Sequence, residues 1–292
     1  MAAVTSVSTI RADGVDVFYR HAGAETAPVI LLLHGFPSSS HQFRNLIPLL
    51  AARYRVIAPD LPGYGFTNVP AERNYKYTFA NLTTTVAAFV DALHVKRFAI
   101  YIFDYGAPTG LRLALQRPES IAAIVTQNGN AYVEGFGHPF WDPIEKLWKT
   151  GAQEDRDALR GLLVADTTKF QYEHGSPHPG KIAPEAYLLD QALMDRPGNK
   201  EIQLDLFQDY GSNVPLYPKF QEYFRTSGVP VLAAWGQNDI IFIAPGGEAY
   251  ARDVKKFELK KVDAGHFAIE TNETLYAKYI FDFFDKYDVF KA

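Results

Sequence analysis

An aspartate stands where a buried apolar run breaks into a helical pattern, in the stretch "IYIFDYGAPTG". Asp104 directly follows the run Phe98–Phe103, whose residues are all apolar. A carboxylate is a poor nucleophile toward esters, but it displaces a leaving group from an sp3 carbon and forms an alkyl ester. This residue type therefore suits the opening of a strained epoxide ring or the loss of a halide. As a structural alternative, Asp104 would only cap the helix that follows.

Two later loops carry an acid and a histidine. Asp239 ends the segment "WGQND", and His266 lies in the segment "AGHF", each after an apolar run. In open α/β sheets, reactive groups gather outside the carboxyl ends of the strands, so Asp104, Asp239 and His266 are expected to meet there. His266 would activate a water that attacks the Asp104 ester, and Asp239 would orient the imidazole. The ordinary alternatives are a turn residue for Asp239 and a loop histidine for His266.

Short apolar runs recur along the chain and are expected to form the strands that position these loops. The runs are Val29–Leu33, Tyr54–Ala58, Phe98–Phe103, Ile121–Val125, Val229–Ala234 and Phe257–Val262. Because they do not alternate with polar residues, they are typical of strands covered on both faces, as in a parallel sheet. Helical patterns separate them, which predicts an open α/β sheet. Alternating residues on both sides of Asp13-Gly14 predict an N-terminal hairpin.

The alternation of strands and helices stops between Asn130 and Gly228. That region is rich in aromatic residues, prolines and helical patterns, and it carries no convincing strand pair. The sequence therefore predicts three segments. Residues 1–130 form the first part of an α/β core, residues 131–228 a helical lid, and residues 229–292 the second part of the core.

Four motifs taken together resemble one family: "HGFP", "DLPGYG", the aspartate at the strand-to-helix turn and "AGHFAIE". Over nearly its whole length the chain resembles the α/β-hydrolase superfamily, and within it the branch of epoxide hydrolases and dehalogenases. The resemblance implies the order nucleophile, acid, histidine, and hence Asp104, Asp239 and His266 as catalytic residues. Of the eight histidines, only His266 follows Asp239. The implied fold is a mostly parallel central sheet flanked by helices, with an inserted helical lid.

The same resemblance implies an oxyanion hole and a sharp turn at the nucleophile. The backbone N–H groups of Phe36 and Tyr105 would hold the oxyanion formed during ester hydrolysis. The turn usually has a small residue two positions on either side of the nucleophile. Gly106 supplies one of them, but Ile102 occupies the other position. We therefore expect a compensating adjustment near Ile102.

Epoxide hydrolysis to a diol is the leading hypothesis for the reaction. Resemblance to epoxide hydrolases implies two lid tyrosines that polarise the epoxide oxygen. Tyr210, in "FQDYGSN", best matches the second of them, whereas the first is not identified. Phe36, Tyr210 and Trp148 are the candidate substrate-binding residues, and the expected substrate is a small apolar molecule.

Dehalogenation is the alternative reaction. Haloalkane dehalogenases hold the halide with a Trp after the nucleophile and commonly an Asn after the His-Gly pair, where this chain has Tyr105 and Phe36. Fluoroacetate dehalogenases carry two arginines where this chain has Tyr105 and Pro108. Trp148 and Tyr210 could still cradle a halide in the lid. A non-catalytic ligand-binding member of the fold is the remaining alternative.

Other polar residues near these motifs are expected to be structural. His34 would brace its loop, Asp60 would stabilise a turn, and Glu270 would sit favourably at a helix start. His174 and His178 are four residues apart, but the Gly-Ser-Pro between them spoils a helical metal-binding face. We expect no metal and no cofactor other than water as a reactant.

Composition narrows the class of protein further. The net charge is -4 with charges of both signs interspersed, so neither nucleic acid nor an anionic membrane is an expected partner. The absence of cysteine excludes disulfides and thiolate catalysis. The longest apolar runs are too short to span a bilayer, and the first residues lack a signal-peptide pattern. The chain is thus expected to be cytoplasmic. A homodimer is left open, because the sequence does not determine the oligomeric state.

Overall fold

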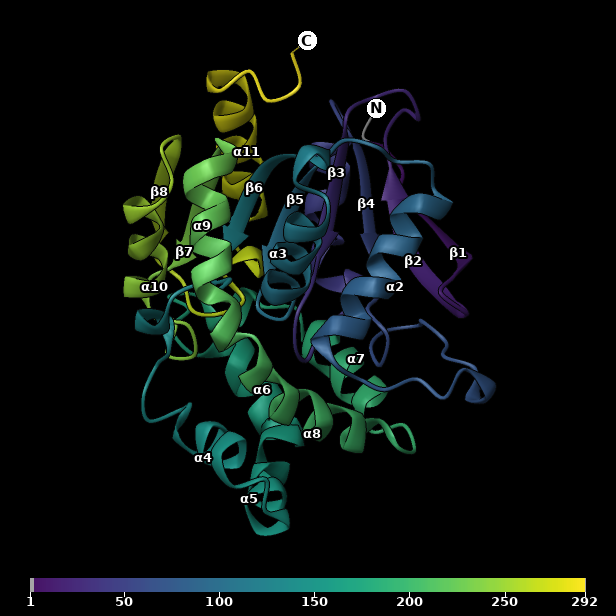
Figure 1. Cartoon of the computed structure of the whole chain (residues 1–292), viewed down its shortest axis with the longest axis vertical. Coiled ribbons are helices and arrows are strands. Elements are labelled where there is room, and N and C mark those ends of the chain that lie inside the picture. The colour runs from purple at the N-terminus through teal and green to yellow at the C-terminus, as the bar shows by residue number, and fades with distance from the viewer. Residues whose placement is uncertain (1–2, 292) are drawn as a thin grey trace.

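One mixed sheet forms the centre of the molecule, and helices cover both of its faces (Figure 1). The computed structural model describes residues 3–291, and within them the sheet has eight strands in the order β1-β2-β4-β3-β5-β6-β7-β8. β2 runs antiparallel to β1 and β4, and the other neighbours are parallel. The predicted fold, a mostly parallel sheet flanked by helices, is confirmed.

The strands coincide closely with the apolar runs of the sequence. They are β1 (Ser6–Ala12), β2 (Val15–Ala22), β3 (Val29–Leu33), β4 (Arg55–Pro59), β5 (Phe98–Phe103), β6 (Ile121–Gln127), β7 (Val231–Gly236) and β8 (Phe257–Val262). The predicted bounds of β3, β5 and β8 are confirmed. β7 begins two residues later than predicted, because Pro230 has no N–H to donate to the ladder.

The N-terminal hairpin forms as predicted. Its two strands are joined by Asp13 and Gly14, with φ of 52° and 72°. Positive φ at both central residues is the requirement of the two-residue turn that matches the twist of the strands. This hairpin places β2 beside β4, and so closes one side of the sheet with antiparallel strands.

Helices form two layers and a separate group at the end of the sheet. The helices are α1 (Leu46–Leu50), α2 (Phe79–Ala92), α3 (Gly106–Gln116), α4 (Asp142–Thr150), α5 (Gln153–Ala158), α6 (Ala165–Glu173), α7 (Pro184–Met194), α8 (Asn199–Asp209), α9 (Tyr217–Ser227), α10 (Ala244–Ala249) and α11 (Glu273–Lys286). α2 and α3 lie on one face of the sheet and α11 on the other (Figure 1). Helices α4 to α9, called here the helical insertion, follow β6 and precede β7.

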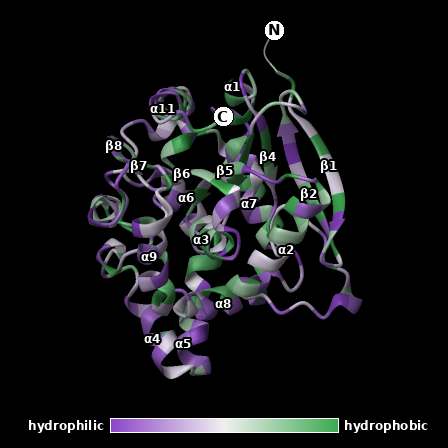
Figure 2. Ribbon diagram, turned by 45° about the horizontal axis from the view of Figure 1, so that its top comes forward, coloured by the Kyte–Doolittle hydropathy of each residue, from purple (hydrophilic) through white to green (hydrophobic). Residues whose placement is uncertain are grey.

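The sheet supplies the core of the molecule. All residues of β3, β5, β6 and β7 are buried, as the unalternated runs predicted. In Figure 2 the hydrophobic colour follows the central strands, whereas α4 and α5 carry much hydrophilic colour. Each fully buried Ile, Leu or Phe contributes about 1.5–3 kcal/mol to stability. Among the described residues, no helix is both long and apolar enough to cross a membrane.

Candidate active site

A strained turn carries Asp104 at the carboxyl end of β5. Its φ is 48°, in the left-handed region, and α3 begins two residues later. Such a conformation costs a non-glycine residue about 1–2 kcal/mol, so the surroundings must enforce it. A Cβ on Gly106 would lie 2.2 Å from the Leu33 carbonyl oxygen, and one on Gly35 would lie 2.2 Å from Asp104 Oδ1. Glycine at these two positions therefore lets β3, the turn and the carboxylate approach closely.

The expected adjustment near Ile102 is found in α3. A Cβ on Gly110 would lie 2.6 Å from Ile102 Cγ2, closer than real Cβ contacts allow. Glycine at this helical position thus makes the room that a small residue at position 102 would otherwise provide. At this contact the larger residue, Ile102, lies on the strand and the small residue, Gly110, lies on the helix. The sharp turn at Asp104 is therefore retained.

Three strand ends bring the predicted triad residues together. His266 Nδ1 lies 2.7 Å from Asp239 Oδ2, and His266 Nε2 lies 3.8 Å from Asp104 Oδ2. Asp239 Oδ1 accepts a 2.7 Å hydrogen bond from the backbone N–H of Ile241. All three triad side chains are buried, and His266 Nε2 has no hydrogen-bond partner in the described residues. The imidazole is therefore oriented from one side, and its other nitrogen faces the Asp104 carboxylate.

Asn128, which the sequence analysis did not single out, holds the acid in place. Its Nδ2 donates to Asp239 Oδ2 at 2.8 Å and to the Phe242 carbonyl at 3.3 Å, and its Oδ1 accepts from the Gly236 N–H at 2.8 Å. Asn128 follows β6 directly and has a φ of 44°. An asparagine followed by glycine after a buried strand was the available signal, because Asn tolerates the left-handed region.

Backbone amides hold the Asp104 carboxylate. The Phe36 N–H donates to Asp104 Oδ1 at 2.6 Å. The Tyr105 amide also acts on the carboxylate and, with that of Phe36, lowers its pKa. The two predicted oxyanion donors thus converge on the same side chain.

Burial and neighbouring charges shift the pKa values of Asp104 and His266. Burial raises the pKa of Asp104 to about 6, although His266 and the two amides oppose the rise. Burial by itself lowers the pKa of His266, but the flanking carboxylates of Asp239 and Asp104 outweigh it and leave that pKa above its ordinary value. The site therefore stabilises the imidazolium form of His266 between two carboxylates.

Tyr210 supplies a buried hydroxyl in the aromatic group above the nucleophile. Its ring centroid lies 5.7 Å from that of Tyr105 and 5.4 Å from that of Phe79. In the described residues its hydroxyl makes no hydrogen bond of standard geometry. Burial raises the pKa of Tyr210 well above its ordinary value, and the neighbouring Tyr217 hydroxyl and the Asp104 charge add to the rise. Tyr210 is thus a protonated hydroxyl that lies next to the hydroxyl of Tyr217.

A second such hydroxyl belongs to Tyr64, in the "DLPGYG" motif of the core. Its ring packs edge-on against His34 at 5.3 Å, and its buried hydroxyl also lacks a partner in the described residues. Burial raises the pKa of Tyr64, and the charge of Asp104 raises it further. The sequence analysis looked for the first donor in the lid only, so this core tyrosine was missed.

The two other predicted substrate-binding residues contribute ring surfaces. The Trp148 ring stacks on Tyr210 at 5.9 Å and 11°, but its indole N–H donates to the Phe207 carbonyl at 2.8 Å. The indole N–H of Trp141 likewise donates to the Ile241 carbonyl, at 2.7 Å. Phe36 packs its ring against Phe207 at 5.0 Å. These tryptophans therefore shape an apolar wall and have no free donor for an anion.

The residues expected to be structural have internal partners. His34 Nε2 accepts from the Leu61 N–H at 2.9 Å, and burial lowers the pKa of His34 to about 4, so the imidazole is neutral. Asp60 accepts from the amides of Ser40 and Phe66, each at 2.7 Å. Glu270 forms an ion pair with Arg44 at 2.7 Å. Their side chains brace the loops around the site.

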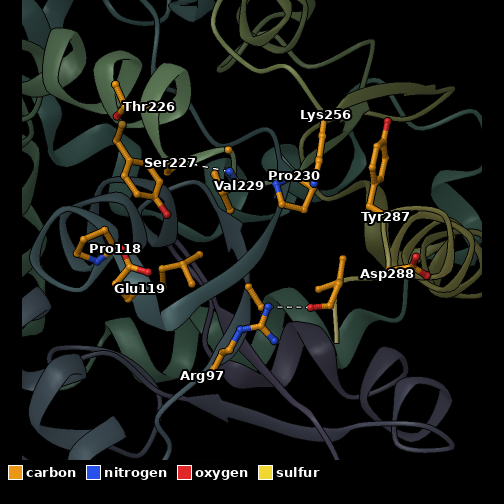
Figure 3. Close-up of a pocket in the computed structure, with 15 residues that line it drawn as sticks. Arg97, Pro118, Glu119, Thr226, Ser227, Val229, Pro230, Lys256, Tyr287 and Asp288 are labelled. Carbon is orange, nitrogen blue, oxygen red and sulfur yellow. Dashed lines mark hydrogen bonds between the residues drawn. The ribbon is translucent and has the colours of Figure 1, made fainter. Parts of the chain in front are cut away.

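Two voids differ in what they can hold. One of about 10 Å³, the size of one water, is lined by His266, Asp239 and residues of α6. A much larger cavity of about 510 Å³ lies at the amino ends of the strands, where Arg97, Glu119 and Lys256 line it (Figure 3). None of the triad residues lines that larger cavity.

Within the described part of the chain, no three His, Asp or Glu side chains cluster as metal ligands.

The comparisons with known proteins identify the family. The family model described as "alpha/beta hydrolase fold" matches residues 28–273. An uncharacterized hydrolase of Saccharomyces cerevisiae is 50% identical over 276 residues, which cover 93% of this chain and 94% of the yeast protein. A haloalkane dehalogenase of Psychrobacter cryohalolentis is 35% identical over 139 residues, 47% of this chain and 45% of that one.

Solved structures share the fold. A haloalkane dehalogenase from Agrobacterium tumefaciens superposes with a TM-score of 0.80 at 21% identity, covering 97% of both chains. An epoxide hydrolase from Vigna radiata superposes with a TM-score of 0.75 at 23% identity, covering 97% of this chain and 98% of that one. At 21–23% identity, this likeness shows that the chains share an overall fold.

Proposed function

We propose that this chain, which belongs to the α/β-hydrolase family, hydrolyses a small apolar epoxide to a diol through an ester on Asp104. The observation that carries the proposal is the pairing of two groups in one buried site. One is the Asp104 carboxylate, held by the Phe36 amide at 2.6 Å. The other is the protonated Tyr210 hydroxyl, which makes no hydrogen bond of standard geometry in the described residues.

Ring opening would be the first step. Asp104 Oδ2 attacks an epoxide carbon, the C–O bond breaks, and the ring oxygen takes the proton of a tyrosine hydroxyl as its negative charge develops. Tyr210 is the proposed donor, and Tyr64 is a candidate for the second. A donor matters here because an alkoxide is a poor leaving group, whereas a halide departs without a proton.

Hydrolysis of the ester would be the second step. His266 Nε2 accepts a proton from water, and the water oxygen attacks the Asp104 carboxyl carbon. The backbone N–H groups of Phe36 and Tyr105 stabilise the resulting oxyanion. When this intermediate collapses, the diol oxygen takes the proton from the imidazolium, and the proton of the new Asp104 carboxyl returns to the tyrosinate left by ring opening, so that both groups are regenerated. Asp239, itself held by Asn128 at 2.8 Å, keeps the imidazole in the required orientation.

Dehalogenation is the second candidate, because the Psychrobacter cryohalolentis relative is named as a haloalkane dehalogenase. The same Asp104 and His266 chemistry would serve it. The contacts of the tryptophans favour the epoxide, since the indole N–H groups of Trp148 and Trp141 already donate to backbone carbonyls. A halide leaving from Asp104 would have to find other donors.

The mass of a trapped intermediate tests the proposal. In a His266→Gln variant the ester should persist, because its hydrolysis needs the base. After incubation with a panel of epoxides and haloalkanes, a gain equal to a whole epoxide supports the proposal. A gain equal to substrate minus hydrogen halide identifies a dehalogenase. The double variant Asp104→Asn/His266→Gln is the control and should gain nothing. No adduct in either variant would indicate a non-catalytic binding protein or a substrate outside the panel.

A further inference from the structure

A buried polar cluster outside the triad joins the helical insertion to the core. Tyr172 of α6 donates its hydroxyl proton to Asp190 Oδ2 of α7, and the same hydroxyl lies 3.3 Å from Ser38 Oγ. All three side chains are buried, with exposed fractions of 1–2%. The reaction steps above do not use any of them.

Through this cluster the insertion touches both loops that carry the proposed hydrolytic groups. The Tyr172 ring stacks on Phe267 with centroids 3.8 Å apart and planes 9° apart, and Phe267 directly follows His266. Ser38 closes the loop of the oxyanion donor, because its N–H donates to the Gly35 carbonyl at 2.9 Å. One tyrosine of the insertion therefore contacts the loop His34–Ser38 and the loop Ala264–Phe267 at once.

The second oxygen of Asp190 faces a void rather than a donor. Asp190 Oδ1 is buried without a partner in the described residues, and so is Gln203 Oε1. Both residues line a void of about 10 Å³, together with Ser38 and Tyr64, which is enough for one water. Two acceptors across one small void need a hydrogen between them. A protonated Asp190 supplies it directly, whereas an ionised Asp190 depends on a water or on the Tyr64 hydroxyl that lines the same void.

The charges around Asp190 favour its protonated form. Burial raises the pKa of Asp190 to about 8 against the opposing hydrogen bonds of Tyr172 and Ser38, and the charge of Glu270 adds to the rise. Arg44 opposes it, but the guanidinium is engaged by Glu270 at 3.0 and 2.7 Å. Tyr172 and Tyr64, the other ionisable groups around the carboxyl, are neutral because burial raises their pKa values well above the ordinary range.

We propose that Tyr172 and protonated Asp190 form a latch by which the helical insertion holds the loops His34–Ser38 and Ala264–Phe267 in register, and that ionisation of Asp190 releases it. Both are positioning residues, since they act on the Phe36 amide and on His266 only through the loops. The inference rests on the proposed function for its catalytic consequence. An ionised Asp190 is a buried charge beside Glu270 and opposite Gln203 Oε1. The hydrogen bond from Tyr172 does not offset its burial, so the cluster opens.

Hydrogen–deuterium exchange of the unliganded protein tests the latch without any substrate. In Tyr172→Phe, which keeps the stacked ring, the amides of both loops should exchange about tenfold faster, as expected for one lost buried hydrogen bond. In the wild type, after correction for intrinsic rates, the same acceleration should appear as the pH rises through about 8. Asp190→Asn, which stays neutral, should abolish that pH dependence.

Matched controls and a kinetic readout complete the test. Tyr187→Phe and Asp195→Asn alter a tyrosine and a carboxylate of the same α7 region and should behave as the wild type. With an active substrate, kcat should fall above about pH 8 in the wild type but not in Asp190→Asn, with KM little changed. The latch is refuted if Tyr172→Phe leaves both loops protected, or if Asp190→Asn retains the alkaline change. Hydrogen–deuterium exchange is measured without substrate, so it tests the latch whether or not the proposed reaction is correct. A failure of the proposed reaction would show separately, as the absence of an adduct on Asp104.

Discussion

Neutralising Asp104 should lower the pKa of His266, and this change would turn the imidazole into a base at the right moment. The ester on Asp104 is uncharged, and Asp104→Asn imitates it with a side chain of nearly the same shape. Before attack, the anion at 3.8 Å stabilises the imidazolium. After attack that stabilisation is gone, so His266 releases its proton more easily and can accept one from water.

The distance sets the size of the effect. Two unit charges 3.8 Å apart interact by about 4 kcal/mol at an effective dielectric constant of ~20, or about 3 pKa units. The Phe36 amide already draws charge toward Asp104 Oδ1 and away from Oδ2, which reduces this value. We therefore expect the pKa of His266 to fall by about 1–3 units in Asp104→Asn.

Nuclear magnetic resonance of protein with ¹⁵N-labelled histidine measures this pKa directly. The His266 ring signals are identified by their loss in His266→Gln and followed from pH 4 to pH 10. Asp91→Asn, which removes an exposed carboxylate paired with Arg117, is the control and should leave the pKa of His266 unchanged. A pKa of His266 that stays the same or rises in Asp104→Asn would refute this account of how the base is switched on.

Other predictions follow from single contacts. Tyr210→Phe should slow ester formation from an epoxide by about 10²–10⁴-fold while leaving any haloalkane reaction nearly unchanged, as single-turnover rates would show. Asn128→Ala should lower the free energy of unfolding by about 2–4 kcal/mol in urea titrations, because it strands a buried carboxylate and a backbone N–H. Gly110→Ala should destabilise the protein by about 1–3 kcal/mol through its clash with Ile102, and the same substitution made in an Ile102→Ala background should cost much less. Because burial raises the pKa of Asp104 to about 6 and only the anion attacks, kcat/KM should fall tenfold per pH unit below about 6; a flat profile there would contradict the assignment.

The fold could be predicted because its strands are continuous apolar runs. Phe98–Phe103 and Val29–Leu33 are covered on both faces, and their sequences carry that burial directly. The error at the start of β7 has a local cause in Pro230, which lacks the N–H that a central strand must donate. The contact between Ile102 and Gly110 could be predicted only in part. Ile102 at the position of a usual small residue indicates that a neighbour must be small, but the sequence does not show that this neighbour is Gly110.

The contacts of the candidate site were harder to predict, because they depend on which loops meet in space. Asn128 lies 111 residues before the Asp239 it holds, and no local pattern joins the two. Tyr64 belongs to a core motif, so a search among lid tyrosines misses it. The engaged N–H of Trp148 depends on the path of the Phe207 backbone, which the sequence does not specify.

The central claim is that Asp104 itself attacks carbon, and a single turnover in H₂¹⁸O tests it most directly. With enzyme in excess over an epoxide substrate, the new diol oxygen should come from the Asp104 carboxylate and carry no label. The ¹⁸O should appear instead in the peptide that contains Asp104, as mass spectrometry after digestion would show. If the label enters the diol in the first turnover and Asp104 stays unlabelled, water attacks directly and the proposed ester does not form.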